Sequence, residues 1–287
     1  MLGMSSKASD SAAAARVLLP AWQTLFFVVP LLFLIVGSLG HLQNYELNYF
    51  PPTLDNYREV LSESIFWESL VYTARISFIT ATLSTFITFV VSPAVVWGFE
   101  RKKIPYILVF FVVPLVVGYP IRLHGWHQML LENGAVNSLL RSIGIIGDRE
   151  SISYTREALV LVYISQYVSP IMIYPILRLM EINTSSVLAA RNLGASRIQV
   201  VLDFVVKPMA VPLLVVFLVV FFLCFGDSLA FSVVGGNSGL MLPVYLDSQY
   251  QVNAWPNAMV ISTIMALLVG VPVLITLAWV FNKLDSA

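Results

Sequence analysis

Asp227 is the residue of this sequence whose chemistry stands out most from its surroundings. The eighteen residues before it, Met209 to Gly226, carry no charge. An ionisable side chain at the depth of an apolar run marks by default a path for a polar solute. The alternative is an acid that lies at the surface where the run ends, and both readings stay open. The further candidates for such a path lie at the ends of apolar runs: Tyr119, Arg122, Trp126 and Trp255.

The sequence gives little support for an enzymatic site or a metal site. His124 and His127 have an i, i+3 spacing, but neither a Cys nor an acidic cluster accompanies them, so we expect no metal site. A serine protease acting inside a membrane needs a Ser and a His that face each other. The histidines, which include His41, all fall in polar connections. A GKS or GKT phosphate loop is absent, so we expect no catalytic residues and no ATP site in this chain.

Composition places these residues in a membrane protein. The 287 residues are 58% hydrophobic and 11% charged, with a mean hydropathy of +0.84. Six uncharged stretches each hold a run near the ~20 residues that cross a bilayer. The sequence therefore predicts an all-α protein with six transmembrane helices, and we expect 228–246, which contains GGNSG, to be a loop or a re-entrant segment. The six stretches are 17–45, 76–99, 104–121, 158–177, 208–226 and 248–282.

The distribution of basic residues predicts that both termini are cytoplasmic. With the N-terminus inside, ten Lys and Arg residues fall in inner segments and five in outer ones, and the remaining Arg75 lies in a helix. We expect residues 1–15 to be a disordered tail and residues 16–287 to form one domain. The apolar run after Arg16 is too long for a signal peptide, so it is read as a retained first helix.

The inner connection at about 181–208 has a helix, turn, helix pattern. Thr184, Ser185 or Ser186 can cap a first helix, and Gly194 suits the left-handed position after its end. Ser196, followed three residues later by Gln199, is a capping box that starts a second helix. Small side chains around the turn favour close approach by another protein. The alternative is a hairpin lying on the membrane surface, with its arginines near lipid phosphates.

The segment AARNLGAS, Ala189 to Ser196, resembles the cytoplasmic loop of ABC importer permeases that inserts into a cleft of the ATPase subunit. Segments around 114–140 and 235–262 are similar to spermidine/putrescine-type permeases. The sequence departs from the family pattern at Leu188, which stands in place of a Glu. We expect this replacement to weaken the cap of the first helix. The resemblance implies a type I importer permease and assigns ATPase contact to a set of loop residues: Leu188, Ala189, Ala190, Arg191, Gly194, Ala195 and Ser196.

The same resemblance implies the partners and the location of the chain. The partners are a second, distinct permease, two ATPase subunits that bind the ATP and Mg, and a periplasmic binding protein, with no nucleic acid. The chain itself holds no cofactor and lies in the bacterial inner membrane among lipid. Polyamines or related cationic amino compounds are the expected solutes. A secondary transporter or channel that works without an ATPase is the alternative.

Overall fold

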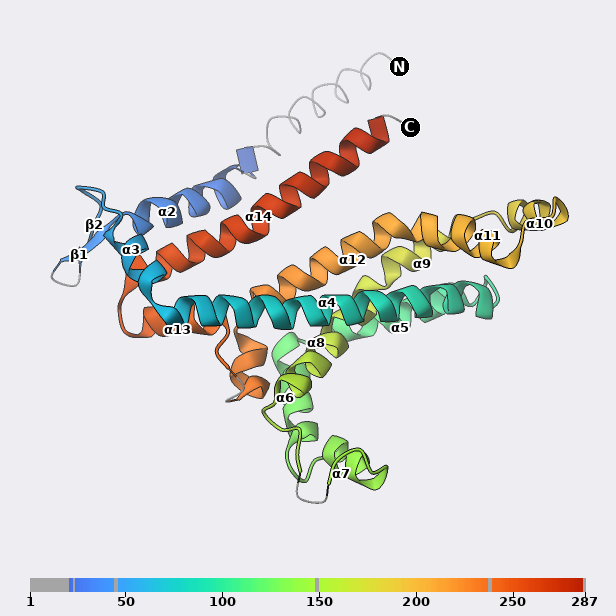
Figure 1. Ribbon diagram of the computed structural model, residues 1–287, viewed down its shortest axis with the longest axis horizontal. Helices are drawn as coiled ribbons and strands as arrows, with labels where there is room; N and C mark the ends of the chain where they lie inside the picture. Colours follow the sequence, from blue (N-terminus) through green and yellow to red (C-terminus); the bar gives the residue numbers. More distant parts are fainter. Residues whose placement is uncertain (1–20, 23, 44–45, 148–149, 237–238, 286–287) are drawn as a thin grey trace, which may run out of the picture. The chain divides into compact units, whose positions relative to one another are not determined.

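The computed structural model describes residues 21–22, 24–43, 46–147, 150–236 and 239–285 (Figure 1). The expected tail, residues 1–15, lies outside these ranges. The chain divides into two compact units. The first contains residues 1–66 and 246–287, and the second contains residues 67–245. Both are built almost entirely of helices, as the composition predicts.

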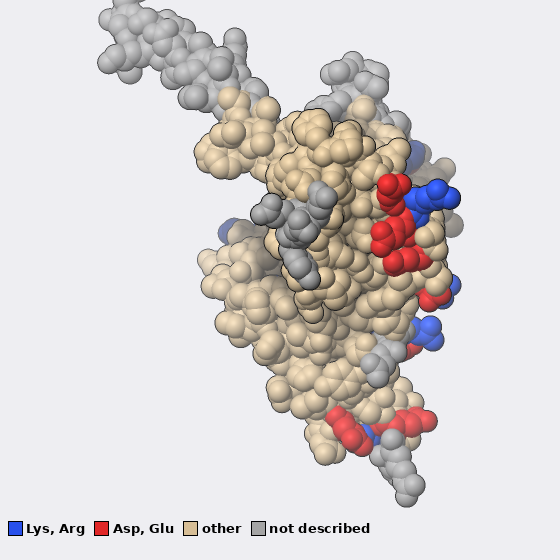
Figure 2. Space-filling view, turned by 90° about the vertical axis from the view of Figure 1, so that its left-hand side faces the viewer, with Lys and Arg blue, Asp and Glu red and all other residues tan. Residues whose placement is uncertain are grey.

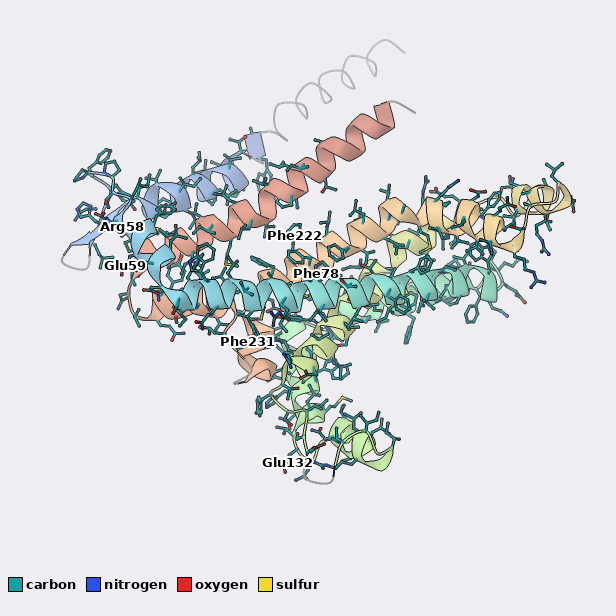
Figure 3. The ribbon with its side chains drawn as sticks, viewed as in Figure 1. Arg58, Glu59, Phe78, Glu132, Phe222 and Phe231 are labelled. Carbon is teal, nitrogen blue, oxygen red and sulfur yellow. The ribbon has the colours of Figure 1, made fainter. Side chains whose placement is uncertain are left out.

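The first unit pairs the two ends of the described chain. A π-helical turn η1 (Thr24–Val28) leads into α2 (Val29–Ser38), which packs along the last helix α14 (Trp255–Asp285). Strands β1 (His41–Gln43) and β2 (Glu46–Asn48) form an antiparallel hairpin. Helix α3 (Asp55–Ser62) is held by Asn56, whose amide donates to the carbonyls of Ser38 and Gly40 at 2.9 and 2.6 Å. Figure 3 labels Glu59 on α3, which accepts a hydrogen bond from Asn257 of α14 at 3.2 Å.

The second unit is organised around α4 (Ser64–Gly98), which starts twelve residues before the expected span. One face of α4 carries hydroxyl side chains at three- and four-residue spacings, and small residues of this kind allow close helix packing. Helix α4 also makes an aromatic contact with α12: Phe78, labelled in Figure 3, lies edge-on to Phe217 with ring centroids 5.6 Å apart. The buried hydroxyl residues are Ser69, Thr73, Ser77, Thr80, Ser84, Thr88 and Ser92.

The third expected span is broken. Helix α5 (Ile104–Val116) and helix α6 (Tyr119–Leu130) meet at a bend of 89°. Pro120 has no N–H to give to the carbonyl of Val116, so α5 cannot continue through it. Gly118 then serves as the N-cap of α6. The expected straight helix over 104–121 is therefore wrong for this region, and its last residues belong to α6.

The remaining helices complete the second unit. They are α7 (Ala135–Ser142), α8 (Arg156–Ile171), α9 (Ile173–Met180), α10 (Thr184–Asn192), α11 (Arg197–Val201), η2 (Leu202–Val206), α12 (Lys207–Phe225) and η3 (Phe231–Gly235). Helix α13 (Leu242–Gln251) runs across the boundary between the units. The segment 228–246, expected to be a loop or a re-entrant segment, thus contains η3 and the start of α13, and the side chain of Asp227 accepts from the N–H groups of Leu229 and Ala230 just before η3.

Four helical segments of the described chain are long and apolar enough to cross a membrane: Ser64–Gly98, Arg156–Met180, Arg197–Phe225 and Trp255–Thr276. The bent α5–α6 pair makes a fifth if it is one span. The expected first span starts in residues outside the described ranges, and its described part, η1 and α2, is shorter. On the face drawn in Figure 2, most of the surface belongs to residues other than Lys, Arg, Asp and Glu, in keeping with a chain that is 11% charged.

A buried asparagine joins α7 to the segment before α8. The amide group of Asn137 donates to the carbonyls of Leu130 and Leu131 at 2.8 and 2.9 Å. Its oxygen accepts from the backbone N–H of Ile152 at 3.0 Å. One fully buried side chain therefore fixes both connections of the α6–α7 hairpin.

Replacing Asn137 by Ala is expected to destabilise this hairpin by about 2–3 kcal/mol, because the hydrogen bonds of a buried amide are lost and the N–H of Ile152 loses its acceptor. The measurement is the melting temperature of the purified protein in detergent. Asn192→Ala, at an exposed helix end, is the control and should leave the melting temperature unchanged. Equal melting temperatures for the two variants would contradict the assignment.

Candidate functional site

The inner connection forms the predicted helical hairpin. Asn183 is the N-cap of α10, and its side chain accepts from the N–H of Ser185 at 2.9 Å. The expected caps at Thr184, Ser185 and Ser186 are therefore wrong by at least one residue. This shift also changes the role of Leu188, which is no longer at the third helical position where a Glu would complete a capping box. The expected loss of cap stability from Leu188 does not apply.

The turn after α10 has the geometry predicted for Gly194. Its φ is +91°, in the left-handed region that favours glycine. The N–H of Gly194 donates to the carbonyl of Arg191, and that of Ala195 to the carbonyl of Ala190, both at 3.0 Å. These two bonds together are a Schellman motif. The turn therefore depends on backbone conformation at a single glycine.

The capping box of α11 is also present. Ser196 accepts from the N–H of Gln199 at 3.3 Å, and the Gln199 side chain accepts from the N–H of Ser196 at 2.8 Å. Helix α11 passes into η2, where the N–H of Lys207 bonds to the carbonyl of Leu202, five residues back. Pro208 explains this shift, because it has no N–H for the carbonyl of Phe204. The hairpin is thus joined to α12 through a π-helical turn.

Gly194→Ala is expected to strain the turn by about 1–2 kcal/mol, because an added Cβ disfavours the left-handed region. Open space surrounds the added atom, so the effect is conformational. Cleavage by trypsin at Arg191 and Arg197 should become about 5- to 30-fold faster in the native protein. Gly98→Ala, which has open space and no positive φ, is the control, and equal cleavage rates in both variants would contradict the strain.

The tip of the hairpin exposes apolar side chains together with cations. Leu193 is 89% exposed and Ile198 is 73% exposed. Ala189 and Arg191 lie on exposed positions of α10. Large apolar side chains exposed beside cations in this way are typical of a site for another protein. Burial of Leu193 alone in such an interface would stabilise the complex by about 1.5–3 kcal/mol.

Asp227 lies at the centre of the second candidate site. Its Oδ1 accepts from the backbone N–H groups of Leu229 and Ala230 at 2.8 and 3.1 Å. Its Oδ2 accepts from the hydroxyl of Tyr167 at 3.1 Å and from that of Tyr119 in a short hydrogen bond. The carboxylate thereby connects α6, α8 and the short helix after α12.

Three tyrosine rings stack beside this carboxylate. The centroids of Tyr119 and Tyr167 are 6.3 Å apart, and those of Tyr163 and Tyr167 are 6.0 Å apart, with nearly parallel planes. The hydroxyl of Tyr163, which is fully buried, donates to the backbone carbonyl of Asp227 at 3.4 Å. We call Tyr119, Tyr163, Tyr167 and Asp227 the tyrosine–aspartate cluster. Its ring faces and carboxylate are groups that attract cations.

Arg122 contacts this cluster through Tyr119 and not through Asp227. Its guanidinium carbon lies 5.9 Å from the centroid of that ring, and its Nη1 donates to the carbonyl of Gln166 at 3.4 Å. No ion pair joins Arg122 to Asp227 among the described residues. Gln166 is 1% exposed, and its amide has no partner in the described part of the chain.

The other sequence candidates have different surroundings. Trp126 is partly buried against the core that contains Tyr163. Trp255 belongs to the first unit and lies edge-on to Tyr250 with centroids 6.2 Å apart. His127 packs against Tyr154, with centroids 5.7 Å apart. Sequence reasoning thus named Tyr119 and Asp227 but missed Tyr163, Gln166 and Tyr167.

A signal for the missed residues exists in the sequence. Tyr163 and Tyr167 are four residues apart, so they lie on one face of a helix. Gln166 is a polar residue within the same apolar run. Asp227, the partner of both tyrosines, is 60 residues from Tyr167 and 64 from Tyr163, so only the tertiary structure identifies the contact.

The comparison with known proteins decides what kind of chain carries these two sites. A family model described as a binding-protein-dependent transport system inner membrane component matches residues 69–286. The chain belongs to this family. It is therefore a membrane permease component of an ABC importer, located in the inner membrane, as the sequence resemblance predicted.

Individual relatives agree with this membership. The chain is 26% identical over 263 residues to the spermidine/putrescine transport system permease protein PotB of Haemophilus influenzae, covering 88% of this chain and 89% of that protein. A crystal structure of a bacterial alginate ABC transporter in complex with an alginate pentasaccharide-bound periplasmic protein contains a similar chain. The TM-score is 0.72, with 16% identity and 94% of each chain covered.

A second solved structure, of a bacterial ABC transporter involved in the import of the acidic polysaccharide alginate, gives a TM-score of 0.69 at 15% identity, covering 96% of each chain. At these identities the two solved structures show the fold alone. The chain therefore has the fold of an ABC importer permease.

Proposed function

We propose that this permease forms half of the path for a small cationic amino compound, such as a polyamine, in an ATP-driven importer. A second, distinct permease of similar fold supplies the other half. Two ATPase subunits bind the ATP and Mg on the inner side, and a periplasmic binding protein delivers the solute. The chain crosses the membrane six times in this proposal. Both termini lie in the cytoplasm, because that orientation places most of the basic residues in the inner segments.

The inner hairpin 181–208 is the proposed contact with the ATPase. The observation that supports this is the exposed apolar tip: Leu193, almost fully exposed, projects from a turn fixed by Gly194 and by the Ser196 capping box. The contact surface extends over the residues that the resemblance assigns to it. Closure of the ATPase subunits moves this hairpin, and η2 and α12 carry the movement into the membrane.

The tyrosine–aspartate cluster supports the choice of a cation. Asp227 supplies negative charge, and the partly exposed rings of Tyr119 and Tyr167 supply further attraction for a positive solute. In this proposal Arg122, which lies over the ring of Tyr119, and Trp126 line the entry of the path, and Trp255 is a further aromatic candidate for it. The name of the Haemophilus relative points to the same class of solute.

Stimulation of ATP hydrolysis by a panel of solutes tests the substrate class. The complete importer is reconstituted in liposomes, and ATP hydrolysis is measured with the binding protein and either spermidine, putrescine or an alginate oligosaccharide. The amines are expected to stimulate hydrolysis, and the anionic oligosaccharide is not. Stimulation by the oligosaccharide alone would contradict a cationic substrate.

A further inference from the structure

An apolar cavity lies between the inner hairpin and the end of α4. Its volume is about 410 Å³, within the ~300–1,000 Å³ typical of sites that hold a ligand. Trp97 of α4 forms one wall, and Val187 and Leu188 of α10 form another. The remaining wall consists of residues from α11 and η2: Val200, Val201, Phe204 and Val205. We call this cavity the inner pocket.

The depth of the inner pocket separates it from the lipid interior. Helices α11, η2 and α12 form one continuous segment of 29 residues, Arg197–Phe225. About 20 residues cross the hydrocarbon core, so a count from Phe225 reaches the inner boundary near Val206. Val201 is five residues beyond that point, or roughly 8 Å at 1.5 Å per residue. With Phe225 taken as the outer boundary, this count places Val200 and Val201 of the pocket wall beyond the hydrocarbon core.

Cations lie one helical turn from the wall of the inner pocket, because Arg191 is three residues after Leu188 and Arg197 is three residues before Val200. Lys207 is neutralised by Asp203, with the charged atoms 2.5 Å apart. Arg191 and Arg197 have no ion-pair partner in the described part of the chain and lie on exposed positions. A complementary surface would therefore present acidic residues around an apolar side chain.

The pocket is continuous with the tip of the hairpin. Leu188 is 59% exposed and belongs both to the pocket wall and to the helix that carries Leu193 to the tip. A Glu at position 188, as the family resemblance predicts, would place a charge on this wall. Leu188 instead completes a wall of apolar residues. The tip and the pocket wall therefore share helix α10.

We propose that the inner pocket receives a bulky apolar side chain of the ATPase subunit, flanked by acidic residues. Each subunit then inserts a side chain into the other: Leu193 enters the ATPase, and an ATPase side chain enters the pocket between Trp97 and Leu188. This inference rests on the proposed docking of the hairpin on the ATPase, and it adds a second, separable contact. It places the ATPase in direct contact with α4 as well as with α12.

Filling the pocket from its own wall tests this contact. In Val200→Trp the new ring occupies the cavity, and the dissociation constant for the purified ATPase subunit of the same importer is measured with the permease complex in nanodiscs. We expect binding to weaken at least ~10-fold, as for a central interface contact. Ala210→Trp, an exposed position on the continuous helix, is the control and should bind within about twofold of wild type. Val187→Phe fills the pocket from α10 and serves as an independent variant if Val200→Trp does not fold.

The outcomes separate this inference from the proposed function. If Leu193→Asp loses the ATPase while both filled variants bind it as wild type does, the pocket contact is overturned and the hairpin contact stands. If Leu193→Asp binds normally, the docking proposal itself fails. If the filled variants keep the ATPase but lose a phospholipid detected by native mass spectrometry, the occupant is a lipid and the inference is overturned.

Discussion

Replacing Leu193 by Asp is expected to separate the ATPase subunit from the purified permease complex and to reduce transport to background. The side chain is 89% exposed in the isolated chain, so the substitution costs little folding stability. In the docked state it would place an unpaired charge in an apolar contact, which costs several kcal/mol. At 1.4 kcal/mol for each tenfold change, binding should weaken on the order of 100-fold.

The matched control is Ser186→Asp, which adds the same charge to an exposed position in the first turn of the same helix. An acid there is favoured by the helix dipole, so both folding and ATPase binding should be retained. Binding is measured with purified subunits in nanodiscs, and uptake in liposomes. Normal ATPase binding by the Leu193 variant would show that the hairpin tip lies outside the contact and would favour a hairpin on the membrane surface.

Replacing Asp227 by Asn is expected to reduce transport of a cationic amine at least ~10-fold while the complex stays assembled. The carboxylate has four donors in the structure, two on each oxygen. An amide offers one oxygen and directs N–H groups at the remaining donors, so the melting temperature should also fall. A loss of about 1.5–3 kcal/mol is expected for hydrogen bonds to a charged group.

Two further variants distinguish a loss of transport caused by the missing charge from one caused by lower folding stability. Tyr167→Phe removes one of the hydroxyl donors to Oδ2 and keeps the charge, so it should lower stability modestly and keep most of the transport. Glu132→Gln, at the exposed α6–α7 turn labelled in Figure 3, removes a distant acid and should have no effect. Wild-type transport by Asp227→Asn would show that the carboxylate only holds helices together.

Local features of the inner hairpin could be predicted from the sequence because they depend on neighbouring residues. The Ser196 and Gln199 capping box and the left-handed Gly194 are both confirmed. The N-cap at Asn183 was missed, because three hydroxyl residues follow it and each can cap a helix on its own. The composition of the chain predicted the helical membrane fold. It did not predict the bend between α5 and α6, which depends on Gly118 and Pro120.

Contacts between distant residues could not be predicted in this way. Asp227 and Tyr119 were identified separately, as an acid and an aromatic at the ends of apolar runs. Their hydrogen bond spans 108 residues of sequence, and periodicity holds no information on which helices meet. The inner pocket is a similar case, because Trp97 and Leu188 each look like an ordinary apolar residue until α4 and α10 are placed together.

The most direct test of an ATP-driven permease is uptake into liposomes that contain the complete importer with either a wild-type ATPase or one that binds ATP without hydrolysing it. With the wild-type ATPase, ATP inside the liposomes and the loaded binding protein outside should give uptake of the amine. With the hydrolysis-defective ATPase, uptake should be lost although the complex remains assembled. Equal uptake in both preparations would contradict the account and establish a transporter that works without ATP hydrolysis.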